Sequence, residues 1–170
     1  MKFVDYISAL GEDYSFLDKF AIREGKLLGI HFEDLTEIPF GLLKEEIPEL
    51  FKVQKYEESI HKLLRTKKKA VPFWRVKKAD NQKKFLFLLW VKDQMVKISE
   101  MEQTYLHNPP DPKLLAAGLR NLDPLGTINT VDLLAGGDIL KWEAIRQLPY
   151  SEVFNKLLKN AIEYRINKEM

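Results

Sequence analysis

The chain has 170 residues, of which 45% are hydrophobic and 31% are charged, and its formal net charge is +2. This length suits one domain, or one domain with an appended helical piece, and it needs no disulfide or metal to hold its core. Because cysteine is absent, a disulfide framework, a thiolate zinc site and a cysteine nucleophile are all excluded. The longest unbroken apolar run, Phe85 to Val91, is far shorter than the roughly 20 residues of a membrane span. We therefore expect a soluble, cytoplasmic protein without a membrane partner.

The charge is distributed unevenly. Residues 1–61 carry thirteen acidic and seven basic residues, whereas residues 62–84 carry ten basic residues and one acid, Asp80. Residues 85–170 are close to neutral, with ten basic and eleven acidic residues. The chain is acidic at the front, basic in the middle and balanced at the back.

Helical patterns dominate the first part of the chain. Residues 2–10 fit one helix, and residues 15–29 fit a second that ends near Gly29. In the second helix the apolar residues Phe16, Phe20, Leu27 and Leu28 can share one side. A third helix is expected from Thr36, with Pro39 in its first turn, and Pro48 is expected to break or restart it before it continues through Leu64.

The basic middle of the chain lacks helical periodicity. We expect residues 65–78 to be irregular, with a short extended segment at 70–76 because Pro72 disfavours helix for its neighbour. Asp80 and Asn81 are N-cap candidates for the longest helix, roughly 81–106, which carries a broad apolar stripe. A β-hairpin across 73–87 is the alternative interpretation of the same segment.

Prolines and glycines divide the last part of the chain. Residues 108–112 form a Pro-rich linker, and we expect one helix to begin at Pro112 and another at Pro124. Gly136 closes the second of these, after which Asp138 caps a helix that stops before Pro149. A final helix is expected over 150–168. The predicted fold is all-α, an irregular bundle of about seven helices, with an N-terminal domain at 1–107 and a C-terminal helical region at 111–170.

No pattern in the sequence indicates an enzyme. His31, His61 and His107 each stand alone, without a second ligand at the spacing that a metal would need. The adjacent acids Glu45–Glu46 and Glu57–Glu58 point to different faces of a helix and favour a solvated surface. Nucleophile elbows, phosphate-binding loops and zinc-protease motifs are absent from the sequence. We expect no catalytic residue, no metal and no cofactor.

The basic segment 62–84 is the strongest local feature. Six cations surround Phe73 and Trp74: Lys67, Lys68, Lys69, Arg75, Lys77 and Lys78. Cations interleaved with aromatic rings suit phosphates and stacked bases, but they suit an acidic protein surface equally well. An ordinary solvated face, neutralised by the acidic front of the chain, is the third possibility. Trp90 and Trp142 are predicted to be core residues, whereas Trp74 is a candidate anchor for a partner.

The C-terminal part, residues 123–168, resembles a known family. The residues that carry the resemblance are Asp138, Lys141, Trp142, Glu143, Leu148, Pro149, Tyr150, Val153 and Phe154. This pattern is similar to the C-terminal part of small morphogenesis proteins from tailed phages and prophages of Bacteroidetes, and to the helical end of some phage tail assembly chaperones.

The resemblance implies a non-catalytic protein that acts in virion assembly. Its partners would be other phage morphogenesis or virion proteins, foremost the helical tape measure protein that a tail chaperone keeps soluble, and it would work in the host cytoplasm. A neck, connector or packaged internal protein of the virion is the alternative, and a homo-oligomer is open. Trp142, Tyr150 and Phe154, together with Trp74, are the candidate partner-binding residues. Alternatively, the first three pack the last two helices together.

Overall fold

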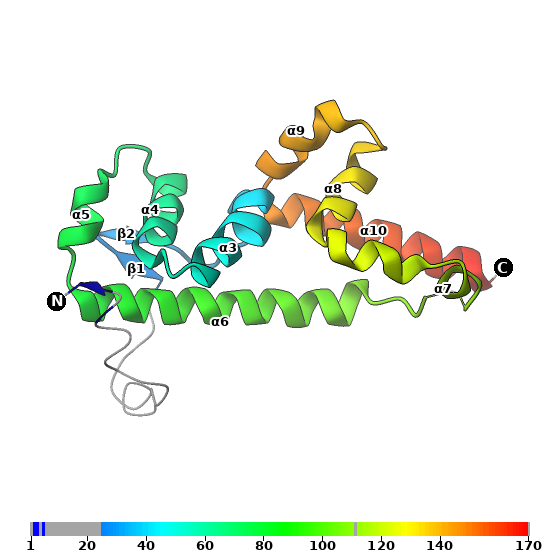
Figure 1. Cartoon of the computed structure of the whole chain (residues 1–170), viewed down its shortest axis with the longest axis horizontal. Helices are drawn as coiled ribbons and strands as arrows, with labels where there is room; N and C mark the ends of the chain where they lie inside the picture. Colours follow the sequence, from blue (N-terminus) through cyan, green and yellow to red (C-terminus); the bar gives the residue numbers. More distant parts are fainter. Residues whose placement is uncertain (1, 4, 6–24, 111, 170) are drawn as a thin grey trace. The chain divides into compact units, whose positions relative to one another are not determined.

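The computed structural model describes residues 2, 3, 5, 25–110 and 112–169. The helix expected over 2–10 and most of the one expected over 15–29 lie outside these residues. Helices make up most of the described chain, and the expected all-α, multi-helix fold is confirmed (Figure 1). Two compact units are present: Met1–Leu35 with Glu46–Lys97, and Thr36–Glu45 with Ile98–Met170. Each unit is discontinuous in sequence, so their bounds differ from the domains expected at 1–107 and 111–170.

The first unit contains a small β-hairpin where the sequence predicted the end of a helix. Strands β1 (Lys26–Leu27) and β2 (Ile30–His31) pair antiparallel, with Lys26 opposite His31. Both turn residues have positive φ, 53° at Leu28 and 78° at Gly29, which is the geometry of a tight two-residue hairpin turn. The prediction of a helix ending near Gly29 is therefore wrong for residues 26–31. Gly29 supplies positive φ to a hairpin instead of closing a helix.

Three short helices follow in the first unit: α3 (Ile47–Lys52), α4 (Tyr56–Lys67) and α5 (Phe73–Lys78). Pro48 lies in the first turn of α3, but the chain is already helical before it, and the break expected there falls at residues 53–55 instead. The prediction that 65–78 is irregular holds for residues 68–72 and is wrong for the rest, since α4 continues to Lys67 and α5 is helical. Pro72 restricts the residue before it and not those after it, and its own φ of −71° suits the position that precedes a helix.

Helix α6 (Asn81–Leu106) has the predicted bounds. Its start is capped by Asp80, whose Oδ1 accepts a hydrogen bond of 3.0 Å from the backbone N–H of Lys83. The hairpin alternative across 73–87 is therefore wrong. Residues up to Lys97 belong to the first unit and those from Ile98 to the second.

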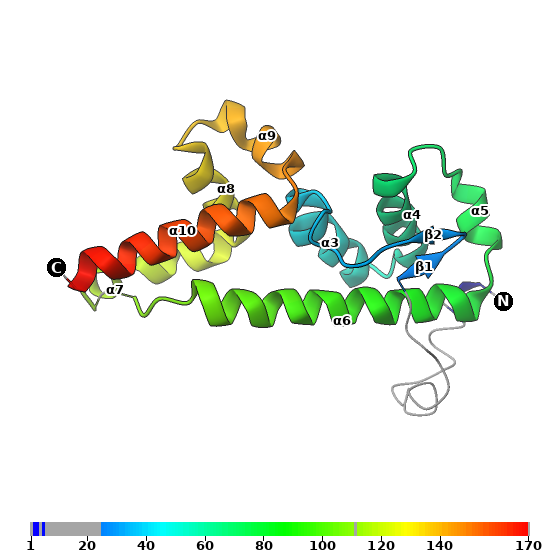
Figure 2. The same ribbon diagram turned by 180° about the vertical axis from the view of Figure 1, so that it is seen from behind.

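The core of the first unit is built on aromatic rings beside the hairpin. Phe32, Phe87 and Trp90 contact one another with ring centroids 5.8–6.1 Å apart, and all three are buried. Trp90 is thus a core residue, as predicted. Figure 2 shows β1 and β2 beside the first turns of α6, from which Phe87 and Trp90 arise.

The second unit consists of short helices and one long one. Its elements are the π-helical turn η1 (Leu42–Glu46, of which Glu46 belongs to the first unit), α7 (Pro112–Ala116), η2 (Leu119–Leu125), α8 (Thr127–Ala135), η3 (Ile139–Lys141), α9 (Trp142–Gln147) and α10 (Tyr150–Glu169). Gly136 ends α8 at φ 68° and Asp138 caps η3, as predicted. Pro124 does not open α8, however, because it lies inside the 3₁₀ helix η2.

Segments more than 100 residues apart in sequence are joined in the second unit. Pro39 and Pro149 form an isolated antiparallel bridge. Beside it, the N–H of Phe40 donates to the carbonyl of Leu148 (2.8 Å) and the N–H of Tyr150 donates to the carbonyl of Ile38 (2.9 Å). These bonds place the residues before η1 directly against the start of α10.

Candidate interaction surfaces

The basic–aromatic surface of the first unit is formed by the end of α4, the following loop and α5. It consists of Lys67, Lys68, Lys69, Phe73, Trp74, Arg75, Lys77 and Lys78, which are all exposed. Helices α4 and α5 pack side by side (Figures 1 and 2). The loop is tied to α4 by a hydrogen bond of 2.8 Å between His61 Nε2 and the carbonyl of Val71. Val71 and Val76 are buried beneath the surface, so this segment is a folded platform.

A lysine ammonium lies over each of the two exposed aromatic rings of this surface. The ammonium of Lys77 lies 5.0 Å from the centre of the Phe73 ring, and that of Lys78 lies 5.3 Å from the centre of the Trp74 ring. The i,i+4 spacing on α5 brings each pair together. Trp74 is 58% exposed, so its ring is accessible from solvent.

The positive charge of this surface is not balanced within the described first unit. Four of its helical acids pair elsewhere, Glu46 with Lys62, Glu57 with Lys84, and Glu49 and Glu58 with nearby lysines. Of the ten cations of segment 62–84, Lys62 and Lys84 form these ion pairs, and Lys84 is buried. No ion pair with a described carboxylate joins any of the six cations on the surface.

Two of the candidate partner-binding residues lie in the core. Tyr150 is 1% and Phe154 is 9% exposed, and their rings stack with centroids 6.0 Å apart. They pack α10 into the second unit and are not available to a partner, which corrects that prediction. Trp142 is half-buried, and its indole N–H donates to Asp132 Oδ1 (3.2 Å). Trp142 was also predicted to be a core residue, and it is less buried than that prediction requires.

An exposed apolar surface in the second unit was not predicted. We call it the 119–140 surface, and its members are Leu119, Leu122, Leu125, Ile128, Leu133, Ile139 and Leu140. Three of the leucines recur every third residue on the 3₁₀ helix η2, where residues three apart lie one above the other. Leu140 is 89% exposed. The three-residue spacing was visible in the sequence, but it is also typical of a buried α-helical face.

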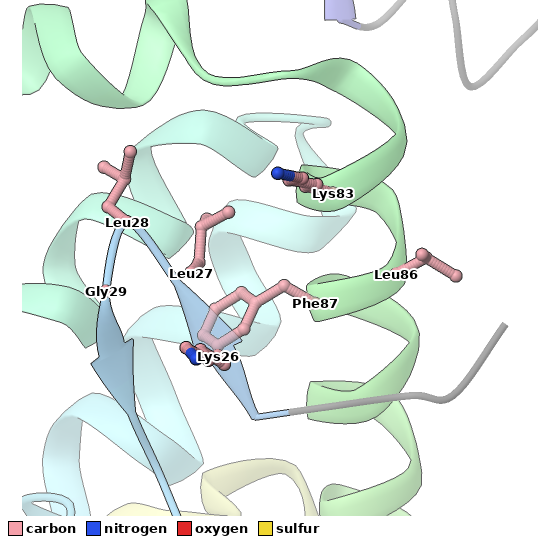
Figure 3. Close-up of a pocket in the computed structure, with 7 residues that line it drawn as sticks. All are labelled: Lys26, Leu27, Leu28, Gly29, Lys83, Leu86 and Phe87. Atoms are coloured by element: carbon pink, nitrogen blue, oxygen red, sulfur yellow. The ribbon is translucent and has the colours of Figure 1, made fainter.

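A small pocket lies at the hairpin of the first unit. It has a volume of about 320 Å³ and is lined by Lys26, Leu27, Leu28, Gly29, Lys83, Leu86 and Phe87 (Figure 3). Its polar side chains are two lysines. Among the described residues that line it there is no acid, histidine or hydroxyl.

The histidines and paired acids do not form a site among the described residues. His31 and His107 are exposed, and His61 is engaged by the loop before α5. Glu45 pairs with Arg146 at 2.7 Å, while the other three candidate acids take part in the ion pairs given above. No group of three potential metal ligands occurs in the described part of the chain. Nor does any helix found there have the length and apolar character needed to cross a bilayer.

Comparison with known proteins found no match for the chain among family models, curated proteins or solved structures.

Proposed function

We propose that the chain is a non-catalytic assembly or structural protein that acts by binding other proteins through the 119–140 surface. The observation that carries this proposal is the concentration of large apolar side chains left in solvent there, on a unit that already buries Tyr150, Val153 and Phe154. The elements that carry these side chains pack together, α8 against both η2 and η3, and a cluster of exposed apolar side chains on a folded protein is typical of a site that another chain covers.

The side chains on this surface favour a helical partner. They are aliphatic, and those on η2 form a row along one face. An amphipathic helix can lay its apolar face along such a row, with anchors at every third or fourth residue. The tape measure protein of a tailed phage, rich in such helices, is the partner that the resemblance of residues 123–168 suggests. A chaperone for that protein is the version of the proposal that we favour, and a neck, connector or packaged internal protein is the alternative.

Co-expression with the tape measure protein of the same phage tests the proposal. We expect the chain to keep that protein soluble and to co-purify with it, and we expect finished particles to lack the chain by mass spectrometry. The double variant Leu122→Glu/Leu140→Glu should abolish both effects. Val53→Glu/Val96→Glu is the matched control, because these exposed apolar residues of the first unit lie outside the 119–140 surface.

Three results decide between the versions. Stoichiometric amounts of the chain in finished particles would replace the chaperone with a virion component. Unchanged solubility and co-purification in the Leu122→Glu/Leu140→Glu variant would contradict the assignment of the surface. A tape measure protein that is equally soluble without the chain would contradict the chaperone activity itself.

A further inference from the structure

The basic–aromatic surface of the first unit has no role in the proposed function, and its chemistry indicates a different ligand. We propose that this surface binds single-stranded nucleic acid, with the bases stacked on Trp74 and Phe73 and the phosphates held by the surrounding lysines and Arg75. This inference does not depend on the assembly function, since the 119–140 surface belongs to the other unit.

Unpaired positive charge is one property of this surface that indicates a ligand. Six cations within twelve residues are exposed, and no described carboxylate pairs with them, while four helical acids of the same unit are engaged in other ion pairs. Like charges held together on a folded platform repel one another, and an anionic ligand removes that repulsion. The complementary ligand is therefore a polyanion.

The apolar side chains that accompany the charge are aromatic. Among the described residues of 62–84 the only large apolar side chains exposed are Phe73 and Trp74, whereas Val71 and Val76 are buried. An acidic partner helix would need aliphatic contacts or a groove for its anchors. The surface offers flat rings instead, and ring faces are what bases stack on without regard to sequence.

The cations of this surface lie close to the rings. The ammonium of Lys77 is 5.0 Å from the centre of the Phe73 ring, and that of Lys78 is 5.3 Å from the centre of the Trp74 ring. Because each ammonium lies over its ring, a base that stacks on that face displaces the ammonium, and the flexible lysine can then contact the phosphate of the same nucleotide. Each ring–lysine pair thus matches one nucleotide.

Fluorescence anisotropy with a labelled oligothymidylate of about 20 nucleotides tests the proposal on the full chain. We expect saturable binding at about 50 mM salt, with an affinity whose logarithm falls linearly with the logarithm of salt concentration. The triple variant Lys67→Gln/Lys68→Gln/Lys69→Gln should make that slope shallower by about two, since each lost contact with a single strand removes about 0.7. Trp74→Ala should weaken binding on the order of tenfold or more, and Trp74→Phe should retain most of it.

A second triple variant, Lys92→Gln/Lys97→Gln/Lys156→Gln, is the matched control. It removes the same charge from exposed lysines elsewhere in the chain, and we expect it to leave the slope nearly unchanged. Thermal unfolding followed by circular dichroism should show all variants folded. Polyglutamate is the matched ligand, with repeated negative charge but no bases, and it should bind more weakly than the oligonucleotide and show no dependence on Trp74.

The proposal is overturned by any of three results. These are no saturable binding at low salt, equal effects of the two triple variants, or an affinity that Trp74→Ala leaves unchanged. Polyglutamate binding as tightly as the oligonucleotide would assign the surface to an acidic protein instead.

Discussion

The hydroxyl of Tyr150 donates a hydrogen bond of 2.9 Å to Oε1 of Glu102. The other oxygen of Glu102 accepts from Lys44 Nζ at 2.7 Å, so one carboxylate joins η1, α6 and α10 within the second unit. Burial of Tyr150, reinforced by the negative charge of Glu102, raises the pKa of its hydroxyl well above the ordinary value of 10.0. The phenol is therefore held neutral in the folded chain.

Replacement of Tyr150 by Phe tests this network at two pH values. Near neutral pH we expect Tyr150→Phe to lower the free energy of unfolding by about 1.5–3 kcal/mol, the usual range for a hydrogen bond to a charged group. Because the folded pKa is raised, the stability linked to this titration is fully present below pH 10 and is lost as pH rises above it. Urea unfolding at neutral and alkaline pH should show a smaller alkaline loss in Tyr150→Phe than in the wild type. Equal losses in the two proteins would contradict the raised pKa.

Glu57→Gln tests the buried lysine of the first unit. Lys84 is 1% exposed; its Nζ lies 2.6 Å from Glu57 Oε1 and 4.5 Å from the centre of the Phe3 ring. Removing the carboxylate leaves a buried ammonium without its counter-charge. We expect a loss of about 2 kcal/mol, below the 3–5 kcal/mol of a fully buried pair because Glu57 keeps 26% of its side chain exposed.

The double variant Glu57→Gln/Lys84→Met is the control for that experiment. An apolar side chain of similar length removes the unpaired charge, so urea unfolding should show a good part of the stability restored. A double variant less stable than Glu57→Gln alone would show that the lysine is retained for something other than its pairing with Glu57.

Two glycines on either side of β1 should respond differently to alanine. A Cβ added at Gly25 would lie 2.5 Å from the carbonyl oxygen of Phe32 and 2.6 Å from the Trp90 ring, whereas one at Gly29 meets nothing within 4 Å. We expect Gly29→Ala to cost about 1 kcal/mol, from its positive φ alone. Gly25→Ala should cost more, about 2–3 kcal/mol, because backbone and core must move. Thermal unfolding of the two variants measures the difference, and equal melting temperatures would contradict the close approach at Gly25.

Asp138→Ala tests the cap that connects α8 to α9. Asp138 Oδ1 accepts from the backbone N–H of Leu140 at 3.1 Å, and its loss should cost about 1 kcal/mol. Asp138→Asn keeps an acceptor but loses the exposed ion pair with Lys141, so it should stay within a few tenths of a kcal/mol of the wild type. If the two variants are equally destabilised, the ion pair and not the cap is responsible.

The elements that the sequence predicted well are those set by local backbone chemistry. The cap at Asp80, the glycine after Ala135 and the cap at Asp138 fix helix ends by hydrogen bonds within three residues or by one left-handed φ. Such signals are readable without knowing what the helix packs against. The start of α6, the end of α8 and the start of η3 follow from them.

The hairpin at 26–31 could not be predicted in the same way. The usual residues of its turn type are Asn and Gly, but this turn is made by Leu28 and Gly29. A leucine at positive φ is held there by the surroundings, with Leu27 buried and Phe32 hydrogen-bonded back to Gly25. The local sequence pattern favoured a helix, whereas tertiary packing stabilises the hairpin.

The candidate site was predicted only in part. Trp74 and the six cations of the basic–aromatic surface are exposed, because a run of charges in a short segment rarely finds room in a core. Tyr150 and Phe154 look equally suited to a partner in the sequence, yet they are buried. Which face of an amphipathic helix is covered depends on distant segments, and for Tyr150 these are residues 38 and 102.

The bridge between Pro39 and Pro149 has a consequence for how the protein is made. Thr36–Glu45 leaves the ribosome more than 100 residues before the strand-like residues that it pairs with. Its backbone groups must wait for Leu148, Tyr150 and Ser151 to be synthesised, which is a contact of high sequence separation and slow to form. The second unit is therefore completed only after residue 151 has been synthesised, and a nascent chain stalled before residue 148 would lack the backbone partners of Thr36, Ile38 and Phe40.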